Sequence, residues 1–388
     1  MKPKRNWLNK IPFVVAAVLA VGLVAVGCVG GMAPVGWSGG TVSGGTLYVG
    51  SSEGQLVAVN LTDESRRWSE QLQATSRPGL FGCAAGGSTA VAIYGSPVVV
   101  GDLVYIAGYN GKIYAYTAAT LSSRWVFPRE GYFEPFVGGL VAGGGKLFVG
   151  GSDGKVYALD AATGDKLWEF TTGDKIWATA AFYENTIFEG SGGQFTNEDT
   201  LFIGSFDKKL YALNANDGTK KWEFTTGGAI ITTPLVFDST IYVGSFDRTL
   251  YALRAADGVE KWRFTGNNWF WAQPAVWKGV IYAGNLDGNV YALDAENGGK
   301  VAEFQTGPLS AAPVVVDDFV VFAAKNGAVW KIDTASREMA KITDLVAEVD
   351  GPLATSDGDV YIHAQGTSLY RINIGSGERR LITLKSGE

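Results

Sequence analysis

The chain has 388 residues, of which 53 are glycine, 12% are aromatic and only 18% are charged. This composition favours many short strands joined by tight turns. The net charge of −6 does not suit nucleic acid, whose phosphates require a basic footprint, and the single histidine leaves almost nothing for a histidine-rich metal centre or a Ser-His-Asp triad.

Residues 1–27 have the pattern of an export signal. The basic segment MKPKRNWLNK precedes an uncharged apolar run that extends from Ile11 to Gly27 and leads to Cys28. The motif AVGC at 25–28 resembles the lipobox of bacterial lipoproteins, in which the cysteine thiol is acylated. The run continues to about Trp37, so an uncleaved membrane helix and a plain cleaved signal are the alternatives. All three interpretations place the rest of the chain outside the cytoplasm, and the first two anchor it to a membrane.

Removal of residues 1–27 would change the charge and the cysteine pairing. The mature chain would keep 28 basic and 38 acidic residues, a net charge of −10. If Cys28 is lipidated, Cys83 has no partner within the chain and remains a lone thiol.

From about residue 40 onward one phrase recurs eight times. LYVGSSEGQLVAVN at 47 and LFVGGSDGKVYALD at 147 are two copies, and from Phe202 the aromatic residue of the phrase returns every 39 or 40 residues. Asp-Gly or Asn-Gly dipeptides, which accept a tight hairpin turn, join the second and third strand-like pieces. Four antiparallel strands at this period are typical of a propeller blade. We therefore predict an all-β, eight-bladed β-propeller over residues 40–388, with residues 28–39 as a tether.

A tryptophan recurs in the fourth strand-like piece of five copies. A large flat side chain at one position of the repeat can wedge between neighbouring blades and bury roughly a hundred Å² or more. The predicted blade-docking residues are Trp68, Trp125, Trp168, Trp222 and Trp262.

An insertion at residues 184–200 interrupts the repeat. It contains TIFEGS, which echoes the IYVGS strand of other copies. We expect it to form a hairpin that extends a blade.

The segment YALDAATGDKLWEF at 157–170 resembles the PQQ-like β-propeller repeat, the tryptophan-docking motif of quinoproteins. The resemblance covers about residues 40–385. Eight such blades behind a signal and a lipobox are similar to a lipoprotein of the outer-membrane β-barrel assembly machinery. The resemblance thus implies a propeller that binds other proteins.

The same resemblance raises the question of a quinone cofactor. Quinoprotein dehydrogenases are much longer, and they hold PQQ with adjacent cysteines and Ca²⁺ with acidic and amide side chains. This chain has no adjacent cysteines and no extended calcium loop, so we predict no cofactor, no metal and no catalytic residue. Four aspartates invite a metal ring but fall at hairpin turns, where aspartate is favoured for backbone reasons: Asp153, Asp207, Asp247 and Asp287.

Bulky aromatic residues interrupt the loops that lead into the first strand of several blades. The loop TGGAIITTP at 226–234 has only small or aliphatic side chains. Trp177 and Trp271 occupy the position at which this loop has Ile231. Equivalent positions repeat around the propeller axis, so these side chains should gather at one end of the ring. They either plug the central channel or form a recognition surface for peptide or another apolar partner. The candidate partner-binding residues are Tyr132, Phe133, Phe136, Trp177, Trp269, Phe270 and Trp271.

These observations favour a non-catalytic, membrane-tethered scaffold that binds protein partners. Its expected partners are the β-barrel assembly machinery or unfolded peptide, and its expected location is the periplasmic face of an outer membrane, or the outer face of the cell membrane where the host has only one. One alternative is a ligand-binding or sensor propeller of the cell envelope. Another is a PQQ-dependent dehydrogenase, which the missing ligands disfavour.

Overall fold

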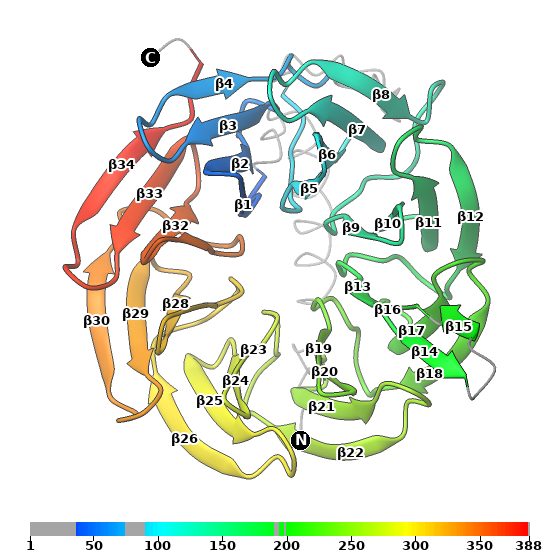
Figure 1. Cartoon of the computed structure of the whole chain (residues 1–388). Helices are drawn as coiled ribbons and strands as arrows, with labels where there is room; N and C mark the ends of the chain where they lie inside the picture. Colours follow the sequence, from blue (N-terminus) through cyan, green and yellow to red (C-terminus); the bar gives the residue numbers. More distant parts are fainter. Residues whose placement is uncertain (1–35, 74–89, 190–193, 198, 387–388) are drawn as a thin grey trace, which may run out of the picture. The chain divides into compact units, whose positions relative to one another are not determined.

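The structure, a computed structural model, describes residues 36–73, 90–189, 194–197 and 199–386, all of which belong to one compact unit. Every helix or strand assigned in these residues is a β-strand. Eight four-stranded antiparallel sheets form the blades of a β-propeller, as the sequence predicts (Figure 1).

Each blade runs from an innermost to an outermost strand. The innermost strands are β1 (Gly40–Ser43), β5 (Val98–Val100), β9 (Val141–Gly143), β13 (Ala181–Tyr183), β19 (Leu235–Phe237), β23 (Ala275–Trp277), β27 (Val314–Val316) and β31 (Ala354–Ser356). The second strands are β2 (Thr46–Gly50), β6 (Leu103–Gly108), β10 (Lys146–Gly150), β16 (Thr200–Gly204), β20 (Thr240–Gly244), β24 (Val280–Gly284), β28 (Phe319–Ala323) and β32 (Asp359–His363).

The third strands are β3 (Leu56–Asn60), β7 (Lys112–Thr117), β11 (Lys155–Asp160), β17 (Lys209–Asn214), β21 (Thr249–Arg254), β25 (Asn289–Asp294), β29 (Ala328–Asp333) and β33 (Ser368–Asn373). The outermost strands are β4 (Arg66–Trp68), β8 (Ser123–Phe127), β12 (Lys166–Thr171), β18 (Lys220–Thr225), β22 (Glu260–Thr265), β26 (Lys300–Gln305), β30 (Met339–Asp344) and β34 (Arg379–Thr383).

The insertion in the fourth blade forms a hairpin of its own. Strands β14 (Thr186–Glu189) and β15 (Gln194–Asn197) pair as a separate two-stranded sheet, while the blade sheet has the order β13-β16-β17-β18. The predicted hairpin is therefore confirmed, but the prediction that it extends the blade is wrong.

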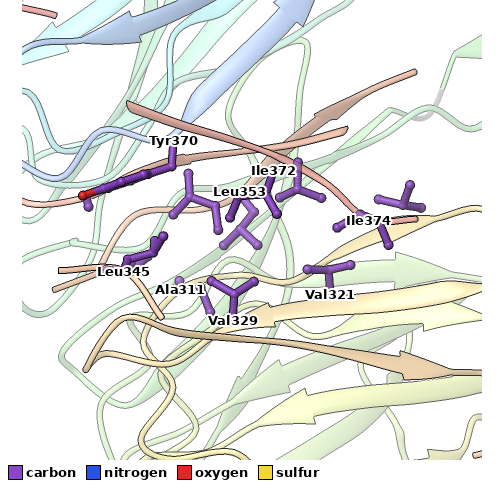
Figure 2. Close-up of a cluster of buried hydrophobic side chains, with 14 residues drawn as sticks. Ala311, Val321, Val329, Leu345, Leu353, Tyr370, Ile372 and Ile374 are labelled. Atoms are coloured by element: carbon purple, nitrogen blue, oxygen red, sulfur yellow. The ribbon is translucent and has the colours of Figure 1, made fainter. Parts of the chain in front are cut away.

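The core lies between the blades. The second and third strands are buried along nearly their whole length, because each is covered on both faces by neighbouring blades. One hydrophobic cluster fills each junction between adjacent blades. Figure 2 shows the cluster between the seventh and eighth blades, where Val321 and Val329 meet Ile372.

The ring closes by packing rather than by exchange of strands. Each blade sheet is built from strands of one stretch of chain. At the closing junction Leu47 and Val57 of the first blade share a cluster with Tyr361 and Leu369 of the last.

Residues 36–39 take part in this closure, so they are not part of a tether as predicted. Ser38 is fully buried, and its carbonyl oxygen lies 2.8 Å from Nδ1 of His363 on β32. Burial lowers the pKa of His363, although two backbone carbonyls near the ring favour the charged form. His363 therefore acts as a neutral, structural strand residue. The predicted signal at residues 1–27, Cys28 and Cys83 lie outside the described residues.

Candidate functional site

One position of the repeat lines a cavity that all eight blades share. In each blade one residue of the innermost strand pairs with the third residue of the second strand, as Thr41 pairs with Tyr48 and Ala275 with Tyr282. The shared position lies four residues before that innermost-strand residue. The cavity has a volume of about 590 Å³, and its lining includes this residue from every blade. The eight residues are Trp37, Tyr94, Val137, Trp177, Ile231, Trp271, Ser310 and Asp350.

This ring of equivalent positions is chemically uneven. Four of its members are aromatic, two are aliphatic, and Ser310 and Asp350 of the last two blades form a polar corner. The Ser310 hydroxyl donates to Asp350 Oδ1 over 3.0 Å. The cavity thus has aromatic walls and one carboxylate, a composition suited to binding organic groups.

A chain of touching aromatic rings extends from this cavity across the fourth, fifth and sixth blades. Trp177 meets Phe206 edge-on, with 4.8 Å between ring centroids, and Phe206 lies 6.4 Å from Phe246. Phe246 in turn stacks on Trp269 at 4.4 Å and on Trp271 at 5.6 Å. We call these five residues the aromatic surface.

A lysine caps one end of the aromatic surface. Lys175 Nζ lies 4.8 Å from the ring centroid of Trp177 and 4.4 Å from that of Phe206, both within cation–π range. Trp269, at the other end, exposes 41% of its surface, whereas Trp177 and Trp271 are half-buried. The surface therefore offers apolar area to solvent while part of each ring is fixed by packing.

The seven predicted partner-binding residues do not share one environment. Trp269 and Trp271 both stack on Phe246, and Trp177 is connected to Phe246 through Phe206. Tyr132 is exposed. The prediction is wrong for Phe136 and Phe270, which expose 0% and 1% of their surface because they fill the hydrophobic core between blades.

Phe133 also packs mainly against interior side chains. It is half-buried, and its ring centroid lies 4.7 Å from that of Tyr157 and 5.4 Å from that of Phe127. These contacts belong to the junction between the second and third blades.

The sequence reasoning missed Phe206, Phe246, Trp37 and Tyr94. Phe206 and Phe246 occupy the middle of the Ser-Phe-Asp turns, where other copies have Ser152 or Leu286. Trp37 and Tyr94 would have been found by extending the repeat alignment upstream of the first strand in every copy. The repeat pattern that would have identified Trp37 and Tyr94 was therefore present in the sequence, but it lies upstream of the recurring strand motif.

Four of the predicted docking tryptophans reach the next blade in the same way. Their indole N–H donates to an alanine carbonyl there over 3.0–3.2 Å, and each indole covers a glycine that has positive φ. A Cβ atom on these glycines would approach the indole to 2.6–2.7 Å. The pairs are Trp125 with Gly164, Trp168 with Gly218, Trp222 with Gly258 and Trp262 with Gly298.

Trp68 packs at the junction between the first and last blades, but not at the equivalent place that the prediction gave it. In β3–β4 the residue opposite Ala58 is Arg67, whereas Ala158 of the third blade faces Trp168 across a register shift. Trp68 consequently points the other way and donates to the carbonyl of Leu384 after the last strand, over 3.1 Å.

Aspartates in the hairpin turns link adjacent blades through hydrogen bonds. Asp207 Oδ2 accepts from the Tyr211 hydroxyl at 2.6 Å and from the backbone N–H of Gly173 in the preceding blade at 2.7 Å. Asp247 does the same with Tyr251 and Gly227, at 2.7 Å each. Within the described ranges, no three acidic, histidine or cysteine side chains gather into a potential metal site.

In the part of the chain that the structure describes, there is no helix of the length and hydropathy that a membrane span needs. The apolar run of residues 11–27 lies outside that part.

Eight four-stranded blades around an axial cavity, with a tryptophan docked at four of the blade junctions, define the class of this protein as an eight-bladed PQQ-like β-propeller. The family model described as outer membrane protein assembly factor BamB matches residues 32–170, 122–188 and 169–383. The chain therefore belongs to this family.

Solved structures agree on the fold. BamB from Moraxella catarrhalis is 17% identical, with a TM-score of 0.65, and the match covers 86% of this chain and 95% of that one. The computationally designed Ika8 protein is 14% identical, with a TM-score of 0.68, and the match covers 89% and 95%. Identities this low show the fold alone. A search of curated proteins found no match.

Proposed function

We propose that the protein is a non-catalytic scaffold, tethered to a membrane outside the cytoplasm, that binds protein partners through the aromatic surface. In a host with an outer membrane it would assist the assembly of β-barrel proteins, in keeping with the description of its family. Cys28, through its lipid, would be the tether.

The observation that carries the proposal is the continuity of the aromatic surface. Five large rings from three adjacent blades touch one another in sequence, and the outermost, Trp269, is 41% exposed. Clustered aromatic side chains are the residues most enriched among the energetic anchors of protein interfaces. A purely structural role would favour burial of Trp269, as for the adjacent Phe270.

Two of the turn aspartates have structural roles. Asp207 and Asp247 are each held by a tyrosine hydroxyl and by backbone N–H groups of two blades. Three hydrogen bonds to each carboxylate hold these two aspartates in the junctions between blades, a structural role that supports a scaffold.

Co-purification from membranes, with the N-terminus intact, tests the proposal. Trp269→Ala should lower the yield of specific partners at least tenfold, about 1.4 kcal/mol of binding free energy. Leu381→Ala is the matched control, because Leu381 is 61% exposed on β34 and lies outside the aromatic surface. Equal partner yields from Trp269→Ala and Leu381→Ala would contradict the proposal.

A further inference from the structure

We infer that the axial cavity binds a small organic cation, at a subsite formed by Trp37, Tyr94 and Asp350. This subsite belongs to the first, second and eighth blades, whereas the aromatic surface belongs to the fourth, fifth and sixth. The inference goes beyond the proposed function and does not depend on it.

Two aromatic rings form the wall of the subsite. Trp37 and Tyr94 meet with 4.3 Å between ring centroids and 60° between ring planes, and Tyr109 lies 5.4 Å beyond Tyr94. Both Trp37 and Tyr94 line the cavity and are only half-buried. The faces of such rings carry partial negative charge and attract ammonium groups, tryptophan most strongly.

The neighbouring carboxylate lies close to this wall. The backbone position of Gly351 packs directly against Trp37, since a Cβ atom there would be 2.2 Å from the Trp37 carbonyl oxygen. Asp350, the preceding residue, lines the cavity, and its side chain is 12% exposed. Asp350 and Trp37 hold the equivalent position in adjacent blades and line the same cavity. The cavity that the aromatic wall faces therefore contains an anion in a partly desolvated place, where charge interactions are stronger than in water.

The charge of Asp350 is only partly balanced. Lys325 Nζ lies 3.3 Å from Asp350 Oδ1, but it also lies 3.9 Å from the carboxylate of Glu348. The other contacts of Asp350, from Ser310 at 3.0 Å and Gln365 at 3.2 Å, come from neutral groups. One lysine shared by two carboxylates leaves a net charge of −1 in this cluster, which favours cations and repels anions.

Size and chemistry together define the ligand class. A volume of about 590 Å³ falls within the range of small-molecule sites. Aromatic faces beside a carboxylate recognise an ammonium group on an apolar body, as in aromatic cages for quaternary ammonium ligands. The class is thus an alkylated or quaternary amine.

A matched pair of probes tests the role of charge. Choline and 3,3-dimethylbutan-1-ol have nearly the same shape, but only choline is charged. We expect the unmodified protein to bind choline at least tenfold more tightly, in titrations followed by tryptophan fluorescence and checked by NMR of the probe. Equal affinity for the two probes, or no binding of choline, would overturn the inference, and this comparison requires no variant.

A pair of variants locates the charge. Asp350→Asn should remove most of the preference for choline, because it keeps the shape of the side chain and removes the charge in the cavity. Glu348→Gln is the control, since it removes a charge from the same lysine cluster but not from the cavity lining. Because the Glu348 side chain is 53% exposed and its charge is screened by water, Glu348→Gln should lower choline affinity by less than Asp350→Asn does. If Asp350→Asn binds choline as tightly as the unmodified protein does, the assignment of the subsite is wrong.

Discussion

Single residues at the blade junctions are matched in pairs. Where a tryptophan docks, the residue of the next blade beneath it is a glycine with positive φ. At three junctions that lack this docked tryptophan, the same turn position holds Glu64, Leu121 or Arg337, with φ of 58°, 56° and 61°. The backbone shape of the turn is thus kept throughout, and only the side chain changes to suit the neighbouring blade.

This pairing predicts the effect of adding one methyl group. Gly298→Ala should destabilise the fold more than Gly358→Ala, by at least about 1 kcal/mol, because its Cβ would meet Trp262 at 2.7 Å. Gly358 also has positive φ but nothing within 4 Å, so its substitution should cost only the backbone term of about 1–2 kcal/mol. Chemical denaturation of both variants measures the difference.

A double-mutant cycle isolates the contact. Trp262 is 8% exposed, so Trp262→Ala should cost about 3–5 kcal/mol by itself. In that background Gly298→Ala should cost no more than Gly358→Ala does. If the cost of Gly298→Ala is unchanged without the indole, the steric pairing is not what fixes the glycine.

At the scale of strands, the repeat predicted which segments pair, but not every register. Ala58 and Trp68 are separated by the same ten residues as Ala158 and Trp168. In the third blade a register shift lets Trp168 face Ala158, whereas β3–β4 pairs without the shift and Trp68 faces Val57. A slip of one residue turns a side chain to the opposite face of the sheet, so spacing alone could not show which blade Trp68 contacts.

Turn chemistry was predictable in part as well. The Asp-Gly turns have positive φ at the glycine, as expected, but Lys208 and Arg248 adopt a φ of 72° in the same place. In both kinds of turn the aspartate accepts a hydrogen bond from a tyrosine four residues later. Asp207 and Asp247 also accept one from the backbone of the preceding blade. Contacts between blades cannot be inferred from one copy of the repeat.

These hydrogen bonds from tyrosine to aspartate make the stability of the blade junctions sensitive to high pH. Burial, together with the hydrogen bond to Asp247, raises the pKa of Tyr251 to about 12. The folded state therefore holds this proton more tightly than the unfolded state, whose pKa is about 10. Stability from this group is complete below pH 10 and is lost as the pH rises toward 12, by at most about 1.4 kcal/mol per pH unit.

Tyr251→Phe tests this linkage. The variant should be less stable at pH 7, since it loses a hydrogen bond to a charged group, and its stability should fall less steeply between pH 10 and 12 than that of the unmodified protein. Urea denaturation across this range is the measurement. Parallel curves for the two proteins would show that Tyr251 does not carry the predicted proton linkage.

For the whole molecule, the sequence predicted an aromatic end of the propeller but not which side chains reach its surface. Trp269 and Phe270 are neighbours in the chain, yet one is 41% exposed and the other 1%. Their difference arises because the loop turns Phe270 beneath Gly244 of the adjacent blade and leaves Trp269 stacked on Phe246. Such alternation depends on the backbone path, which the repeat pattern does not encode.

If the proposed function is right, the aromatic surface binds partners rather than plugging the ring. The most direct measurement is the dissociation constant of a purified partner for the variant in which Trp177, Trp269 and Trp271 are all serine, at a temperature where the variant is folded. Because Phe206 and Phe246 link the three rings, we expect them to act together and the dissociation constant to rise at least tenfold. An unchanged dissociation constant, with a melting temperature lowered by the loss of several kcal/mol of packing, would instead identify the three tryptophans as a structural plug.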